Sequence, residues 1–310
     1  MIARRVPERI AAVASVLMYF LALGGTLLLA VIPAQAVDPL AARLGRWLYR
    51  RDGPRPRQLR ANLRVAMGSD AAEVEIASVA EDVFASYGRY MAEYFTMGWP
   101  DLWGRRRRLV SGDVSAFEAE LARGHGIVLF GIHGGNWDFA AAECARRYGA
   151  FHSAGELVQP AWLGRLTNLM RRRSGIDLYD ARQAGRPLLR ALKRGQVIGL
   201  VADRTVIGNA AEVTLCGRKA RLPRGPVQLA IMAGAPLIPT VMERHADGAV
   251  HVEFLPPIDL SDLRRQRADI DVGVQRMADG LTGMIRRGYR SWYALQPIWT
   301  NDGSSALKSA

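Results

Sequence analysis

The chain has 310 residues, of which 49% are hydrophobic, and its mean hydropathy is close to zero. This length is enough to bury a core, and the composition excludes a protein that crosses the membrane many times. The formal net charge of +13, nearly all from arginine, favours anionic partners such as phospholipid headgroups. Because zinc-finger spacings and aromatic-rich RNA-binding patterns are missing from the sequence, we do not expect nucleic acid as a partner.

The first predicted element is a hydrophobic helical segment at residues 10–32, which carries no charge and is followed by Pro33. It is long enough to cross a bilayer once, with the N-terminus on the cytoplasmic side. The Ala-Gln-Ala run at 34–36 is also typical of a signal-peptide cleavage site. A third interpretation is a helix or helical hairpin within one leaflet, broken at the glycine pair 24–25. We interpret residues 1–36 as a membrane-associated segment and favour this third, monotopic interpretation.

Three helices are predicted next, at residues 40–51, 57–67 and 71–97. The first is amphipathic, because Leu44, Trp47 and Leu48 recur at helical spacing. The second places apolar residues among arginines. Together with the hydrophobic segment, these arginine-rich helices predict binding to an anionic membrane surface.

Strands and helices alternate from about residue 126 onward. The predicted strands are residues 126–132, 176–179, 197–202, 213–216, 237–242 and 250–255. The predicted helices are residues 138–148, 161–173, 187–194 and 226–233. This alternation predicts an α/β fold with a central, mostly parallel sheet flanked by helices. We expect a single domain at residues 37–300 and a flexible tail at 301–310.

His133 directly follows the buried strand predicted at 126–132, which is where α/β sheets place their ligands. Gly134 and Gly135 allow a tight turn and a close approach of the backbone to a substrate. Asp138 comes five residues after His133, in the first turn of the next predicted helix. This position would let its carboxylate fold back toward the imidazole ring.

Such a pair is suited to activating a hydroxyl group. A histidine base can remove the proton of a hydroxyl as it attacks a thioester carbonyl, and a carboxylate at the other ring nitrogen sets the tautomer. We therefore predict His133 and Asp138 as catalytic residues, with backbone N–H groups near Gly134–Asn136 stabilising the oxyanion. We expect no metal, because neither a His-Glu-x-x-His motif nor a His/Cys cluster is present in the sequence.

Two arginine-containing segments are further candidates for substrate binding. Asp203 and Arg204 follow the strand predicted at 197–202, again at a carboxyl end. Arg221 and Arg224 flank a proline, and their guanidinium groups could bind a donor or lipid phosphate.

Several segments resemble a known family of lipid acyltransferases. The run from Gly131 to Asp138 resembles the His-x4-Asp motif of lipid A and phosphatidylinositol mannoside acyltransferases, which belong to the lysophospholipid acyltransferase superfamily. The resemblance runs over most of the chain after about residue 40. The further matching segments are Gln-Leu-Arg-Ala-Asn-Leu at 58–63, Ser-Tyr-Gly-Arg-Tyr at 86–90, Ala-Asp-Arg at 202–204 and Leu-Gln-Pro-Ile-Trp at 295–299.

The resemblance implies transfer of a fatty acyl group from acyl-CoA to a hydroxyl of a phosphatidylinositol mannoside at the cytoplasmic face of the membrane. It implies no cofactor, since the acyl thioester is a substrate. Glu156 and Arg171 match residues of the family's site, and Asp203 stands where the mannoside enzymes usually carry glutamate. A cytoplasmic donor is also why we favour a segment at 10–32 that does not export the enzyme.

Two alternatives remain open from the sequence. One is a lipid A-type or other lysolipid acyltransferase that takes its acyl group from acyl carrier protein. The other is a non-catalytic lipid-binding protein that keeps the fold, which the presence of both His133 and Asp138 argues against.

Overall fold

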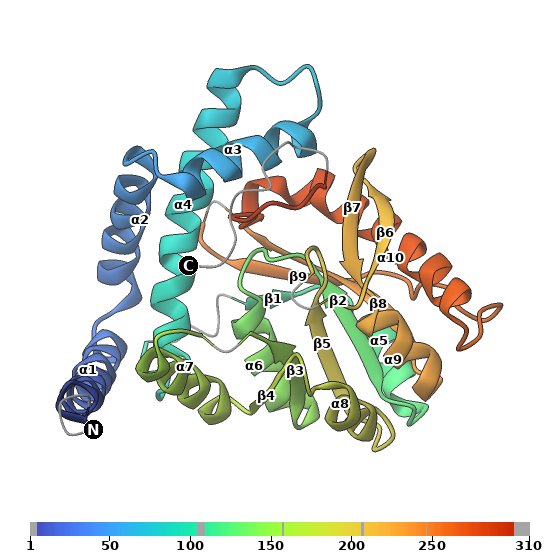
Figure 1. The fold of residues 1–310 in the computed structure, drawn as a ribbon, viewed down its shortest axis with the longest axis horizontal. Coiled ribbons are helices and arrows are strands. Elements are labelled where there is room, and N and C mark those ends of the chain that lie inside the picture. The colour runs from blue at the N-terminus through green and yellow to red at the C-terminus, as the bar shows by residue number, and fades with distance from the viewer. Residues whose placement is uncertain (1–4, 104–108, 157, 206–207, 246, 301–310) are drawn as a thin grey trace.

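A computed structural model describes residues 5–103, 109–156, 158–205, 208–245 and 247–300. The tail predicted at 301–310 lies outside the described residues. The body of the protein is built around one central sheet, with four long helices at its N-terminal side (Figure 1).

The sheet has seven strands in the order β1-β9-β8-β2-β5-β3-β4. Only the β8–β9 pair is antiparallel. The strands are β1 Leu109–Ser111, β2 Ile127–Gly131, β3 Phe151–Gly155, β4 Ile176–Asp180, β5 Val197–Val201, β8 Leu237–Arg244 and β9 Val250–Phe254. Every residue of β2 is buried, as a continuous apolar run between two other strands requires. This arrangement confirms the predicted α/β fold with a mostly parallel sheet.

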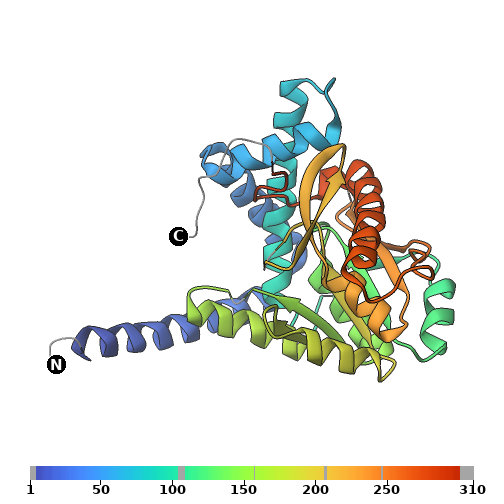
Figure 2. The same ribbon diagram turned by 45° about the vertical axis from the view of Figure 1, so that its right-hand side comes forward.

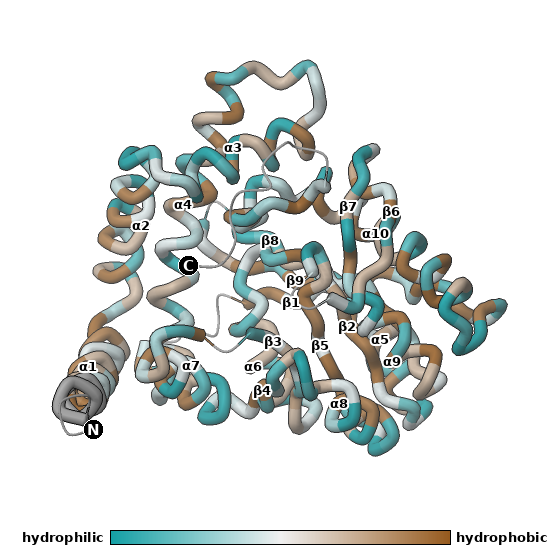
Figure 3. The backbone as a smooth tube through the Cα atoms, in the orientation of Figure 1, coloured by the Kyte–Doolittle hydropathy of each residue, from teal (hydrophilic) through white to brown (hydrophobic). Residues whose placement is uncertain are grey.

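Helices cover this sheet and connect its strands. They are α5 Ser115–Ala122, α6 Trp137–Tyr148, α7 Ala161–Arg173, α8 Gly185–Leu192, α9 Gly225–Ala233 and α10 Arg267–Gly288. α6 and α8 pack against β3, while α9 packs against β2 and β8. Hydrophobic residues gather along the central strands, where they form the core (Figure 3).

A separate antiparallel hairpin, β6 Ala210–Leu215 and β7 Arg218–Pro223, packs against α10. The sequence predicted only part of β6, and it did not predict β1, β3, β7, α5 or α10 as elements. The missed β7 does show the period of a half-buried strand, because Ala220 and Leu222 are buried while Lys219 and Arg221 are exposed.

The N-terminal helices are α1 Arg5–Val31, α2 Ala34–Arg50, α3 Pro54–Met67 and α4 Glu73–Thr96. The predicted break at Gly24–Gly25 is wrong, because α1 continues through both glycines and ends just before Pro33. The stretch Val13–Val31 is long and apolar enough to cross a membrane, and only 11% of it is buried. α1 extends away from the body of the protein (Figure 2).

α2 lies along α4 in close backbone contact, made possible by one glycine on each helix. A Cβ atom built on Gly45 would lie 2.1 Å from the Phe84 carbonyl oxygen. A Cβ atom on Gly88 would lie 2.2 Å from the Ala41 carbonyl oxygen. Both helices therefore need glycine at this crossing.

Candidate active site

Two parallel neighbouring strands bring His133 and Asp203 together. β2 and β5 pair in register, with Gly131 opposite Val201, and each strand is followed two residues later by one of these side chains. The His133 Nδ1 atom lies 2.6 Å from Asp203 Oδ1. The site therefore forms at the carboxyl edge of the sheet, where the sequence predicted it.

Asp203 is held as a carboxylate although it is only 1% exposed. Its second oxygen, Oδ2, accepts hydrogen bonds from the His133 backbone N–H at 3.0 Å and from the Trp292 indole N–H at 2.7 Å. Burial alone would raise the pKa of Asp203, but the electrostatic attraction of the His133 ring and these hydrogen bonds outweigh it, so the pKa lies below its usual range. Because a carboxylate only accepts hydrogen bonds, this contact requires a proton on Nδ1, so Nε2 is the ring nitrogen of the neutral imidazole that can accept a proton.

Asp138 makes a different set of contacts from the predicted one. Its Oδ1 accepts a hydrogen bond from Arg171 Nε at 2.7 Å, and its Oδ2 accepts one from the Tyr90 hydroxyl at 2.6 Å. Within the described part of the chain, the hydrogen bonds of Asp138 go to these two residues and not to His133. The predicted pairing of His133 with Asp138 is thus corrected to His133 with Asp203. The reason is that Asp138 points toward α4 and α7.

Asp138 and Arg171 form a buried ion pair, with exposed side-chain fractions of 4% and 16%. Burial by itself would lower the pKa of Arg171, but the neighbouring carboxylate raises it above its usual range. Burial also raises the pKa of Tyr90 well above its usual range, so the phenol stays protonated and donates to Asp138. Arg171, which the resemblance matches to a residue of the family's site, anchors Asp138 in the structure.

The glycine turn after His133 is fixed by the segment that follows α10. Gly135 has a φ of +62°, and a Cβ atom there would lie 2.6 Å from the Met242 carbonyl oxygen. Its backbone N–H donates to the Ser291 carbonyl at 3.0 Å, while the Tyr293 N–H donates to the His133 carbonyl at 2.6 Å. The Gly135 amide is therefore already used, which removes it from the amides predicted to stabilise an oxyanion.

A buried charged cluster supports the same turn from the other side. Asn136 caps α6 by accepting a hydrogen bond from the Phe139 N–H at 3.0 Å, and it donates to Glu93 Oε2 at 2.6 Å. Glu93 also forms an ion pair with Arg244, whose side chain is 3% exposed. One carboxylate thereby links α4, the glycine turn and the end of β8.

The other predicted binding residues lie in two regions, one at the edge of the sheet near His133 and one at the strand β7 and the residue after it. Glu156 and Arg204, which follow β3 and β5, form an ion pair of 3.1 Å at the same edge of the sheet as His133. Arg221 is exposed on β7. Arg224, in contrast, is buried and binds Asp271 and the Ala210 carbonyl. The prediction that Arg224 binds a phosphate is corrected, because its guanidinium group joins β6 to α10.

The sequence did not single out Trp292, Tyr293, Glu93, Tyr90 or Arg244 as site residues. The signal that could have found Trp292 and Tyr293 lies in their residue types and in their position along the chain. A tryptophan and a tyrosine close to the matched Leu-Gln-Pro-Ile-Trp segment each carry one polar group, and buried aromatic polar groups usually have a partner. Groups of three or more His, Cys, Asp or Glu side chains placed to hold a metal ion do not occur among the described residues.

A histidine whose ring is oriented by a buried carboxylate, at the carboxyl edge of an α/β sheet, is suited to activating a hydroxyl or water for attack on a carbonyl. Residues 9–301 match the family model of bacterial lipid A biosynthesis acyltransferases. The chain belongs to this family and is an O-acyltransferase.

Individual relatives are similar to the chain along most of its length. A phosphatidylinositol mannoside acyltransferase of Mycobacterium tuberculosis is 30% identical over 292 residues, covering 92% of this chain and 89% of that protein. A protein of the same name from Mycolicibacterium smegmatis is 30% identical over 258 residues, covering 82% of this chain and 83% of its own. The resemblance inferred from the motifs is confirmed.

Proposed function

We propose that this enzyme transfers a fatty acyl group from acyl-CoA to a hydroxyl of a phosphatidylinositol mannoside. The observation that carries the chemistry is the His133–Asp203 pair at the ends of β2 and β5. The acceptor class is supported by the relatives, which are named for that glycolipid, and by the segments at 86–90 and 295–299.

The proposed reaction begins with proton removal by His133. Nε2 takes the proton of the acceptor hydroxyl while its oxygen attacks the thioester carbonyl carbon, and Asp203 stabilises the imidazolium that forms. The tetrahedral intermediate then collapses, the carbon–sulfur bond breaks, and the imidazolium returns its proton to the leaving thiolate. The products are the ester and free coenzyme A. Neither a metal nor a cofactor enters this sequence of steps.

The proposed location is the cytoplasmic face of the inner or plasma membrane, with the protein bound as a peripheral or monotopic protein. Support comes from the exposed apolar stretch Val13–Val31 and from the exposed apolar residues of α2. The cleavage-like run at 34–36 forms the first turn of α2.

The first prediction tests the base. Purified His133→Ala and Asp203→Asn enzymes are compared with wild type for transfer from palmitoyl-CoA to a phosphatidylinositol mannoside in vesicles. Loss of general-base catalysis lowers rates by about 10²–10⁴-fold, so we expect this loss for His133→Ala. Asp203→Asn should also lose activity, because the amide no longer stabilises the imidazolium. A His133→Ala enzyme that keeps more than about a tenth of the wild-type rate contradicts the assignment.

The donor and the acceptor are tested separately. The same preparation is offered palmitoyl-CoA and palmitoyl-acyl carrier protein, and the thioester that is used faster identifies the donor. Mass spectrometry of lipids from a deletion strain then identifies the acceptor, since its acylated form is the species that disappears. A strain whose phosphatidylinositol mannosides are unchanged would contradict the proposed acceptor.

A further inference from the structure

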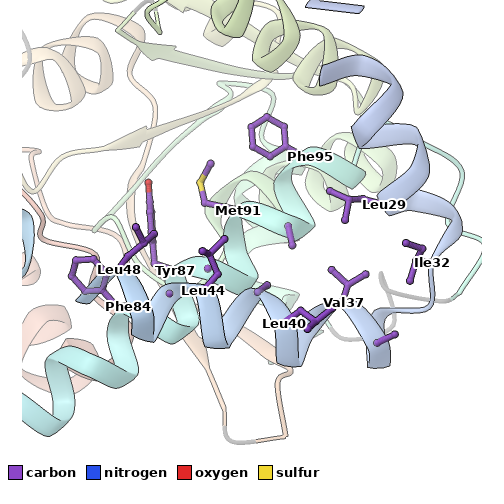
Figure 4. Close-up of a pocket in the computed structure, with 15 residues that line it drawn as sticks. Leu29, Ile32, Val37, Leu40, Leu44, Leu48, Phe84, Tyr87, Met91 and Phe95 are labelled. Atoms are coloured by element: carbon purple, nitrogen blue, oxygen red, sulfur yellow. The ribbon is translucent and has the colours of Figure 1, made fainter. Parts of the chain in front are cut away.

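An apolar groove of about 480 Å³ runs between α2 and α4, closed at one end by the last turn of α1. Figure 4 shows its wall residues along α2 and α4, with Leu29 and Ile32 at the end next to α1. The wall includes Leu40, Leu44 and Leu48 of α2 and Tyr87 and Met91 of α4. The lining carries no charged side chain, which suits a hydrocarbon ligand and not a sugar or phosphate.

The groove exists because of the glycine crossing described above. Gly45 and Gly88 bring the α2 and α4 backbones together, and both also line the groove. The short side chains of Ala41 and Ala92 leave space beside this contact. The groove therefore depends on small residues of α2 and α4.

The mouth of the groove belongs to the surface that we propose faces the membrane. Leu40, Leu44 and Leu48 line the groove and are 63%, 56% and 46% exposed. The exposed guanidinium group of Arg51 lies 3.9 Å above the Trp47 ring on the adjacent face of α2. An apolar opening flanked by arginine matches the boundary between the hydrocarbon region and anionic headgroups.

Aromatic rings connect the inner wall of the groove to the catalytic turn. Tyr87 lines the groove, and its ring centroid lies 5.7 Å from that of Tyr90. Tyr90 lies 4.5 Å from Trp137, which lies 5.3 Å from the His133 ring. Three aromatic side chains, Tyr87, Tyr90 and Trp137, thus connect the inner wall of the groove to the His133 ring.

We propose that this groove binds one alkyl chain of the membrane-resident acceptor lipid. This inference rests on the proposed function and adds how the acceptor reaches the enzyme. A chain entering through the exposed leucines would pass from bilayer to protein without crossing water. An acyl-CoA donor is water-soluble and reaches the enzyme from the aqueous side, whereas the mouth of the groove belongs to the surface that we propose faces the bilayer. The groove therefore fits the acceptor chain better than the donor chain.

A labelling experiment tests occupancy without turnover. Wild-type protein is bound to vesicles containing phosphatidylinositol with a diazirine at mid-chain, irradiated, and digested for mass spectrometry. We expect adducts within α2 and α4, at the peptides that contain Leu44 and Met91. Labelling that avoids both helices overturns the proposal. Labelling removed by excess palmitoyl-CoA would assign the groove to the donor chain and would also overturn it.

A variant experiment tests the role of the groove in acceptor use. Ala92→Phe fills the groove, and Met91→Gln makes its wall polar at similar volume. Val74→Phe is the matched control, because it adds an aromatic ring to α4 at a position that is 78% exposed and outside the groove. We expect each groove variant to lower use of a dipalmitoyl phosphatidylinositol mannoside in vesicles by roughly tenfold or more. Transfer to the deacylated, water-soluble headgroup should be unchanged.

The outcomes separate this inference from the proposed function. If both groove variants lose the long-chain and the deacylated acceptor equally, the groove does not recognise the chain and the inference fails. If wild type uses no phosphatidylinositol mannoside at all, the proposed acceptor fails, while photolabelling of the groove still reports lipid binding. His133→Ala should be labelled as strongly as wild type, because binding of the chain does not require the base.

Discussion

The indole N–H of Trp292 is one of three donors that hold the Asp203 carboxylate, and the residue is completely buried. A hydrogen bond to a charged acceptor contributes about 1.5–3 kcal/mol. Because the pKa of Asp203 is lower in the folded protein than in the unfolded chain, the ionised carboxylate stabilises the fold at pH values above 3.8, the unfolded pKa. This stabilisation is lost as the pH falls through the still lower folded value.

We therefore predict that Trp292→Phe lowers the free energy of unfolding at pH 7 by about 1.5–3 kcal/mol and that this deficit shrinks toward pH 3. Trp299→Phe is the control, because Trp299 donates to the uncharged Leu215 carbonyl at 2.9 Å. Its deficit should not change with pH in the same range. Urea unfolding of both variants at the two pH values measures the difference. A pH-independent deficit for Trp292→Phe would show that the indole does not act through the Asp203 charge.

The Asp138–Arg171 pair gives a second residue-scale prediction. Removing one member of a buried ion pair leaves the other charge uncompensated, which costs about 3–5 kcal/mol. Asp138→Ala should be destabilised by this amount, and the double variant Asp138→Ala/Arg171→Met should recover most of it. Urea unfolding provides the measurement. An Asp138→Ala protein of normal stability but without transferase activity would restore the direct catalytic role that the spacing to His133 first indicated.

At the scale of elements, the contact between α2 and α4 depends on Gly45 and Gly88. Gly88→Ala places a methyl group against the α2 backbone and should destabilise the protein by about 1–3 kcal/mol. Gly283 in α10 has nothing within 4 Å of an added Cβ, so Gly283→Ala should stabilise by about 0.5–1 kcal/mol through helix propensity. Thermal unfolding in detergent compares the two. Equal effects would mean that the α2–α4 crossing relaxes around the added methyl group.

At the scale of the whole molecule, the exposed apolar residues of α1 and α2 lie on one side and α10 on the other (Figure 1). Trp47 on α2 and Val272 on α10 are 48% and 47% exposed. Burying a large apolar side chain in the membrane contributes about 1.5–3 kcal/mol, which corresponds to roughly a ten- to hundredfold change in affinity.

Trp47→Ala should therefore weaken binding to anionic vesicles by about this factor, whereas Val272→Ala should not change it. Added salt should weaken only the electrostatic part of binding, since charges are screened within about 8 Å at physiological ionic strength. Co-sedimentation with vesicles at low and high salt measures both effects. Equal binding by Trp47→Ala and wild type would remove α2 from the membrane-facing surface.

Local patterns in the sequence determined the elements that bear most directly on function. The helix predicted at 161–173 has the same bounds in the structure, and the apolar run at 126–132 contains β2. His133 was found because a buried strand, a glycine turn and a helix follow one another along the chain. Elements with weaker local signals were missed, such as the three-residue β1 and the glycine-containing α10.

The partners of His133 were decided only by the tertiary structure. Asp138 is close to His133 along the chain, yet the hydrogen bond is made by Asp203, which lies 70 residues away. The hydrophobic period shows that a segment is a strand, but it does not show that β5 is the neighbour of β2. Trp292, in the segment after α10, donates a hydrogen bond to Asp203. Arg224 binds Asp271, so its guanidinium group is not free for a substrate phosphate. The sequence by itself thus determined the fold class and singled out His133, whereas strand order and long-range packing determined which groups contact its ring.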